Sequence, residues 1–119
     1  MVARLGSARH ALRGVRVFVS STHNAWVEIG AALVALLMGI YFSITISEWI
    51  AVILSFGILL AAEGFNTAIE VHMDLTSPGE HPYARDTKDI AAGAVFIIAC
   101  MVFLVLCLIF VPKLFAIFR

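Results

Sequence analysis

Four polar side chains recur along one short stretch of the sequence, "EGFNTAIEVHMD", at residues 63–74. Glu63, Asn66, Glu70 and Asp74 are separated by three, four and four residues, the spacing that aligns side chains on one face of an α-helix. Neighbouring carboxylates repel one another, which favours either a raised proton affinity or the binding of a cation. A hard divalent ion such as Mg²⁺ takes oxygen ligands and binds phosphate. This acidic stripe therefore suits proton abstraction or metal binding.

A lysine follows in the next polar segment, where Lys88 precedes Asp89 and comes shortly after Arg85 and Asp86. A lysine can neutralise phosphate oxygens, and acids that hold Mg²⁺ beside it indicate phosphoryl transfer, in which positioning and charge stabilisation do most of the catalysis. The alternative interpretation is structural, because polar side chains in membrane helices also join subunits through hydrogen bonds.

Composition predicts an all-α integral membrane protein. The chain has 119 residues, of which 62% are hydrophobic and 13% charged, and its mean hydropathy is +1.03. Such a short chain cannot bury that much apolar surface in one water-soluble core, so part of it must face lipid or sister subunits. A single domain over residues 1–119 is expected. The formal net charge of zero gives no indication of a nucleic-acid partner.

The apolar segments predict three transmembrane helices, at about residues 26–46, 49–72 and 90–112. Pro78, Gly79 and Pro82 are expected to break any helix between the second and third spans, and Pro112 to end the third. The acidic stripe occupies the last third of the second span. Intramembrane acids are costly unless they face a protein interior or a wet cavity, so they indicate function.

The N-terminal segment predicts an amphipathic surface helix at about residues 4–22. Arginines alternate with apolar residues there, at positions 4, 9, 13 and 16, although a merely solvated basic terminus is the simpler alternative. Six of the eight lysines and arginines lie in this segment or in the second loop. The positive-inside rule then places the N-terminus and the second loop in the cytoplasm and the C-terminus outside. Three thin spans bury little surface, which favours a symmetric homo-oligomer.

These motifs resemble a known family. "EGFNTAIE" followed by Asp74, and then "SPGEHPYARDTKDIAAGAV", is similar to the prokaryotic diacylglycerol kinase family, which includes undecaprenol kinases, over about residues 10–112. The loop "SPGEHPYA" looks more like the undecaprenol kinase branch. The resemblance implies a homotrimer in the bacterial inner membrane, with an N-terminal surface helix. It also implies that MgATP phosphorylates the hydroxyl of diacylglycerol or undecaprenol at the cytoplasmic interface.

The resemblance also implies roles for individual residues. Glu63 matches the proposed general base that takes a proton from the lipid alcohol, and Glu70 matches a metal-binding glutamate. The remaining matches are to the nucleotide pocket and to the basic stretch of the surface helix, which we expect to bind ATP: Asn66, Asp74, Lys88, Asp89 and Arg13.

One position departs from the family pattern. The family commonly has a second metal-binding glutamate before the first span, two residues ahead of an asparagine or small residue. In "STHNAW" that position is Thr22, which has no carboxylate. Thr22 could act through a water molecule, or Glu28 could replace the missing ligand, although six residues further on it lies on another face of the helix and deeper.

Two other functions stay open at this point. A small multidrug-type transporter would exchange protons for a cation at a membrane glutamate, but such proteins usually have four spans and an acid in the first. A non-catalytic relative of the kinases is suggested by Thr22.

Overall fold

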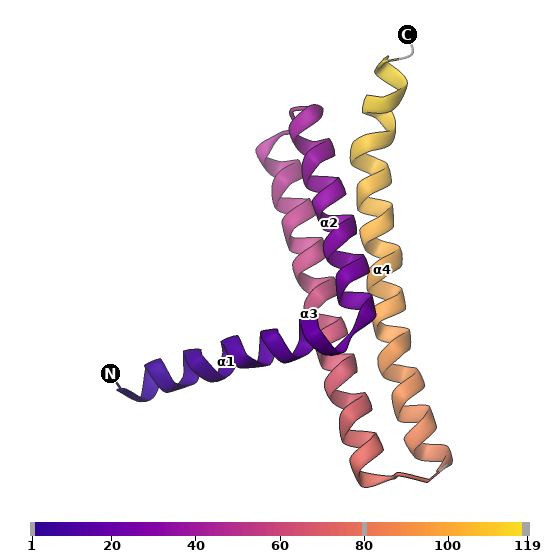
Figure 1. The fold of residues 1–119 in the computed structure, drawn as a ribbon. Coiled ribbons are helices and arrows are strands. Elements are labelled where there is room, and N and C mark those ends of the chain that lie inside the picture. Colours follow the sequence, from indigo (N-terminus) through magenta and orange to yellow (C-terminus); the bar gives the residue numbers. More distant parts are fainter. Residues whose placement is uncertain (1, 80, 118–119) are drawn as a thin grey trace.

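The described part of the chain folds into four α-helices. The computed structural model describes residues 2–79 and 81–117, and the elements within them are α1 (Val2–Ser21), α2 (His23–Tyr41), α3 (Ile46–Thr76) and α4 (Pro82–Ile117). Helices α2, α3 and α4 run alongside one another, whereas α1 points away from the bundle (Figure 1). The same three helices are long and apolar enough to cross a membrane. The all-helical class with three apolar helices is therefore confirmed.

A capping box decides where α3 begins. The Thr45 hydroxyl accepts a hydrogen bond from the backbone N–H of Glu48 at 3.3 Å, and the Glu48 carboxylate accepts one from the Thr45 N–H at 2.7 Å. This reciprocal pair satisfies free N–H groups at the helix start. Helix α3 therefore begins at Ile46, three residues before Trp49. The preceding helix ends at Tyr41, earlier than the boundary near residue 46 expected from hydropathy.

The predicted break between the second and third long helices is confirmed, because α3 ends at Thr76 and α4 begins at Pro82. Pro82 itself is the first residue of α4, a position that needs no N–H and favours the φ angle of proline. The predicted end of the third helix at Pro112 is wrong, because α4 continues through it to Ile117. Apolar helices tolerate proline where neighbouring helices support the freed backbone. Here Lys113, the next residue, forms an ion pair with Glu48 of α3 at 3.1 Å.

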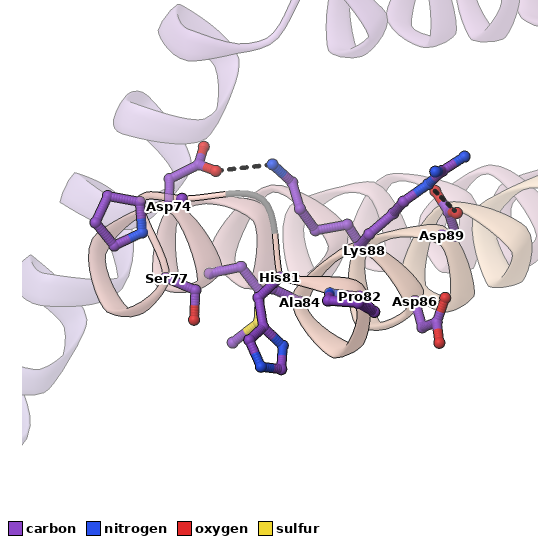
Figure 2. A pocket seen from close by; sticks show the side chains of 12 residues that line it. Asp74, Ser77, His81, Pro82, Ala84, Asp86, Lys88 and Asp89 are labelled. Carbon is purple, nitrogen blue, oxygen red and sulfur yellow. Dashed lines mark hydrogen bonds and ion pairs between the residues drawn. The ribbon is translucent and has the colours of Figure 1, made fainter.

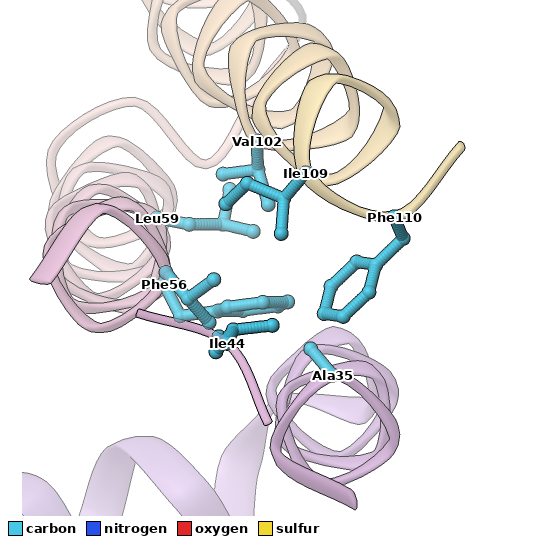
Figure 3. Close-up of a cluster of buried hydrophobic side chains, with 8 residues drawn as sticks. Ala35, Ile44, Phe56, Leu59, Val102, Ile109 and Phe110 are labelled. Atoms are coloured by element: carbon cyan, nitrogen blue, oxygen red, sulfur yellow. The ribbon is translucent and has the colours of Figure 1, made fainter. Parts of the chain in front are cut away.

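The apolar core joins α2, α3 and α4. Eight buried side chains form it: Ala35, Ile44, Val52, Phe56, Leu59, Val102, Ile109 and Phe110. Figure 3 shows Ile109 and Phe110 of α4 projecting between α3 and α2, toward Leu59 and Ala35. All of its α3 members precede residue 60. The core therefore occupies the half of the bundle near the α2–α3 turn and leaves the other half of α3 for polar residues.

Unequal helix lengths expose the end of α3 that carries the acidic stripe. Helix α2 has 19 residues and α3 has 31, so at roughly 1.5 Å per residue they are about 28 and 46 Å long. The two helices are antiparallel and meet at a short turn, so the last third of α3 extends beyond the start of α2, beside the first turns of α4 (Figure 1). The stripe is thus enclosed at its beginning and open at its end.

Candidate active site

The acidic stripe passes from a buried to an exposed environment along α3. Glu63 is 2% exposed and Asn66 is 7% exposed, and these are the buried polar side chains of the described residues. Glu70 is half-buried, and the Asp74 side chain is 69% exposed. The spacing in the sequence predicted one polar face, and the burial gradient along that face arises because α3 is longer than α2.

Within the stripe, Asn66 is bonded to Glu70. The Asn66 amide Nδ2 donates to Glu70 Oε1 at 3.2 Å, across one helical turn. Asn66 Oδ1 is buried and has no hydrogen-bond partner among the described residues. A buried acceptor without a partner is unfavourable by about 1–3 kcal/mol, so this oxygen is suited to a ligand that supplies a donor or a positive charge.

At its exposed end the stripe meets α4. Lys88 Nζ donates to Asp74 Oδ1 at 2.7 Å, and the two side chains lie over a pocket of about 780 Å³ between the end of α3 and the start of α4. Figure 2 shows Lys88 reaching back along the turn toward Asp74, with Asp89 on the adjoining part of α4. Asp74, Lys88 and Asp89 all line this pocket, but Asn66 does not.

The hydrogen bond to Asp74 raises the pKa of Lys88 above its ordinary value of 10.5. Lys88 precedes the uncharged part of α4, which begins at Ile90. A raised lysine pKa means that the pair stabilises the protein fully below pH 10.5 and loses this contribution as the pH rises through the folded-state pKa. Lys88 is therefore cationic at neutral pH, as phosphate binding requires. Asp89 forms only an exposed contact to Arg85 at 3.9 Å, which contributes little.

At the buried end, Glu63 is bonded to a residue that the sequence had not indicated as a site residue. Asn24 Nδ2, in the first turn of α2, donates to Glu63 Oε1 at 3.1 Å. Glu28 lies one turn further along α2, close enough to Glu63 for electrostatic repulsion, and its Oε2 is buried without a hydrogen-bond partner among the described residues. The structure thus places Glu28 beside Glu63.

The two remaining candidates lie at the α1–α2 corner and on α1. The Thr22 hydroxyl donates to the Phe18 carbonyl at 2.7 Å, which leaves its oxygen lone pairs available. Arg13 is exposed on α1, and no hydrogen bond or ion pair in the described chain links it to the stripe. One signal for Asn24 was present in the sequence: it precedes Glu28 by four residues, which puts an amide and an acid on one face of an apolar helix.

The sequence is similar to that of known proteins. Residues 9–110 match the family described as prokaryotic diacylglycerol kinase. The chain belongs to this family. It is also 37% identical over 105 residues to undecaprenol kinase of Bacillus subtilis (strain 168), an alignment that covers 88% of this chain and 85% of that protein. No solved structure gives a significant match.

Membership of the prokaryotic diacylglycerol kinase family makes the chain an enzyme, a lipid kinase that uses ATP as co-substrate. The family and the three long apolar helices together indicate that the chain is a multi-pass membrane protein. The family match favours phosphoryl transfer over the transporter alternative.

Proposed function

We propose that the chain transfers the γ-phosphoryl group of ATP to the hydroxyl of a membrane lipid, with undecaprenol as its acceptor. The observation that carries this proposal is the position of Glu63. Its carboxylate is 2% exposed and lies at the buried end of a stripe whose exposed end reaches Lys88. A lipid hydroxyl can approach such a group from the bilayer, while the nucleotide remains at the polar end.

In this mechanism Glu63 acts as the general base. It accepts the proton of the lipid hydroxyl as the hydroxyl oxygen bonds to the γ-phosphorus, and the bond from that phosphorus to the β,γ-bridging oxygen breaks. Asp74, Lys88 and Asp89 line the nucleotide pocket, where Lys88 neutralises phosphate charge. Asn66, which lies on the stripe about two helical turns before Asp74, and Arg13 of α1 complete the proposed nucleotide contacts. A positioned general base contributes roughly 10²–10⁴-fold to the rate.

The donor set of the stripe fits a magnesium ion. Glu70 supplies a carboxylate, and Asn66 Oδ1 is a buried oxygen without a partner in the described chain; oxygen atoms of both kinds are ligands for Mg²⁺. We propose Glu70 as the metal ligand, with Thr22 acting through water. Glu28 is the weaker candidate, because it neighbours Glu63. When bound, Mg²⁺ would neutralise charge on the phosphates.

The acceptor and the cellular setting belong to the same proposal. The relative named undecaprenol kinase and the loop "SPGEHPYA" support undecaprenol over diacylglycerol. We further propose a homotrimer in the bacterial inner membrane, with α1 along the cytoplasmic surface and the N-terminus inside. The positions of the arginines on α1 and of Arg85 and Lys88 near the α3–α4 turn support this orientation.

The decisive experiment is a kinase assay on the purified protein in detergent. With labelled ATP, Mg²⁺ and either undecaprenol or diacylglycerol, we expect label in extracted undecaprenyl phosphate. Faster labelling of phosphatidic acid would replace the proposed acceptor by diacylglycerol, and no labelled lipid from either would overturn the function.

Glu63→Gln is the matched variant for this assay. It keeps the size and hydrogen-bonding capacity of the side chain but cannot accept the proton, so we expect turnover to fall by about 10²–10⁴-fold. Binding of a fluorescent ATP analogue should be unchanged, because Glu63 does not line the nucleotide pocket. Turnover equal to that of the unchanged protein would contradict the assignment of the base.

A further inference from the structure

Among the described residues, the hydrogen bond between Asn24 and Glu63 is the one side-chain hydrogen bond between α2 and the stripe. It joins side chains 39 residues apart, with Asn24 Nδ2 donating to Glu63 Oε1 at 3.1 Å. The other two stripe contacts are made elsewhere: Asn66 and Glu70 bond within α3, and Asp74 bonds to α4. Helix α2 therefore contributes specifically to the buried end, at the carboxylate proposed as the base.

Among the described residues, Asn24 is the side chain that donates a hydrogen bond to this carboxylate. A glutamate has three rotatable side-chain bonds, so a carboxylate without a donor can take several orientations. One donor on Oε1 fixes the plane of the group and leaves Oε2 free to accept. Because Glu63 is 2% exposed, water cannot readily take over this role.

Glu28 makes the role of Asn24 more specific. Its carboxylate lies on the same face of α2, one turn along, and its buried Oε2 has no hydrogen-bond partner among the described residues. Asn66, three residues after Glu63 on α3, directs its own amide N–H to Glu70. Of these three polar neighbours in the described chain, Asn24 is thus the one that is hydrogen-bonded to the Glu63 carboxylate, so it orients that carboxylate relative to α2.

We propose that Asn24 is a positioning residue for the phosphoryl transfer: its amide holds one oxygen of Glu63 so that the other faces the hydroxyl of the lipid acceptor. This inference rests on the proposed function of Glu63 as base. Asn24 lies two residues after the α1–α2 corner, so the position of the surface helix and the orientation of the base are linked through one short segment.

The test compares three variants at one corner of the bundle. Asn24→Leu keeps the size of the side chain and removes the donor, whereas Asn24→Gln retains an amide on a longer stem. His23→Leu is the control, because His23 is the adjacent residue, is exposed like Asn24, and has no assigned role. Misplacement of a reacting group by about 1 Å can lower a rate by roughly 10²-fold.

We expect Asn24→Leu to lower kcat by about 10- to 100-fold and to leave the KM for ATP unchanged. Asn24→Gln should recover part of this loss in kcat. His23→Leu should behave as the unchanged protein. Groups that act as a unit are not additive. In the Glu63→Gln background Asn24→Leu should therefore cause no further loss. An equal loss in both backgrounds, or a parallel rise in the KM for ATP, would overturn the proposal.

A spectroscopic measurement tests the hydrogen bond without turnover. Infrared difference spectra between the unchanged protein and Asn24→Leu should show a shifted carboxylate stretching band. That band should be absent when both proteins carry Glu63→Gln. If the band appears but no lipid is phosphorylated by the unchanged protein, the proposed function fails and the contact stands. If the spectra are identical, the positioning role fails whatever the activity.

Discussion

Lys88 and Lys113 lie on the same helix, and each forms an ion pair with a carboxylate of α3. Lys88 contacts Asp74 at 2.7 Å, and Lys113 contacts Glu48 at 3.1 Å at the opposite end of the helix pair. Only the first pair lines the polar pocket. The two ion pairs therefore have different expected roles. The Lys88–Asp74 pair lies where phosphates are expected to bind, whereas the Lys113–Glu48 pair supports α4 beyond Pro112.

Replacing Lys88 by methionine should weaken ATP binding. The loss of a charge at the phosphates is expected to raise the KM for ATP at least about tenfold, since hydrogen bonds to charged groups contribute roughly 1.5–3 kcal/mol. Steady-state kinetics with varied ATP measure this. Lys113→Met is the matched control and should leave the KM for ATP unchanged. Equal effects of the two substitutions would argue that Lys88 acts through helix packing.

Thr22 is the position at which the sequence analysis predicts a departure from the family pattern. If Thr22 occupies the place of a metal-binding glutamate, Thr22→Glu adds a carboxylate ligand and should lower the Mg²⁺ concentration for half-maximal activity several-fold. Thr22→Ser, which keeps the hydroxyl, should behave as the unchanged protein. The measurement is a Mg²⁺ titration at saturating ATP. An unaltered Mg²⁺ dependence in Thr22→Glu would mean that the residue is not at the metal site.

At the scale of elements, the α2–α3 hairpin depends on a close approach between helix and ring. A Cβ on residue 39 would lie 2.6 Å from the ring of Trp49 and 3.0 Å from Ile44. Glycine is therefore required at this position because there is no space for a Cβ atom. Backbone conformation is not the reason, because the φ angle of Gly39 is ordinary. Trp49 follows the capping box of Thr45 and Glu48 by one residue, so the cap and the contact together set the angle of the hairpin.

Gly39→Ala should destabilise the protein by about 1–3 kcal/mol, as overpacking of a filled site does. Gly30→Ala, in the same helix, is the control, because a Cβ there meets no atom within 4 Å. Thermal unfolding in detergent, followed by tryptophan fluorescence, measures both. A lower midpoint for Gly39→Ala alone is expected; equal midpoints would show that Trp49 moves aside without cost.

At the scale of the whole molecule, large apolar side chains cover the outside of the three long helices. Examples from each are Leu37, Ile53 and Phe103, all more than half exposed. Such a surface is suited to lipid and to sister subunits. The polar residues, in contrast, gather on one side of α3 and at the α3–α4 turn. The distribution fits a bundle whose substrate enters from the bilayer.

The proposed trimer gives a measurable mass. Light scattering of the purified protein, corrected for detergent, should yield three times the chain mass of 12.9 kDa. The species should persist on dilution, because the contacts are made by extended apolar faces. A mass equal to one or two chains under the same conditions would contradict the trimer.

Much of the architecture was determined by sequence alone. Uninterrupted apolar runs predicted three long helices, because a helix that crosses the bilayer needs about 20 consecutive apolar residues. The spacing of the four stripe residues, Glu63, Asn66, Glu70 and Asp74, placed them on one face, because a helix has 3.6 residues per turn. The family motif lies in the same stretch. The ends of the helices were predicted less well: hydropathy does not register the capping box at Thr45, and it treats Pro82 and Pro112 alike as breaks.

Only the tertiary structure decided which residues meet across helices. Two features, the contact of Asn24 with Glu63 and the location of Glu28 beside Glu63, depend on the axial offset between α2 and α3. No local sequence pattern encodes that offset. It is set by the α2–α3 turn and by packing at Gly39. The burial gradient of the stripe likewise follows from α3 being longer than α2. Periodicity along one helix is a local property, whereas the neighbours of a side chain result from packing between helices.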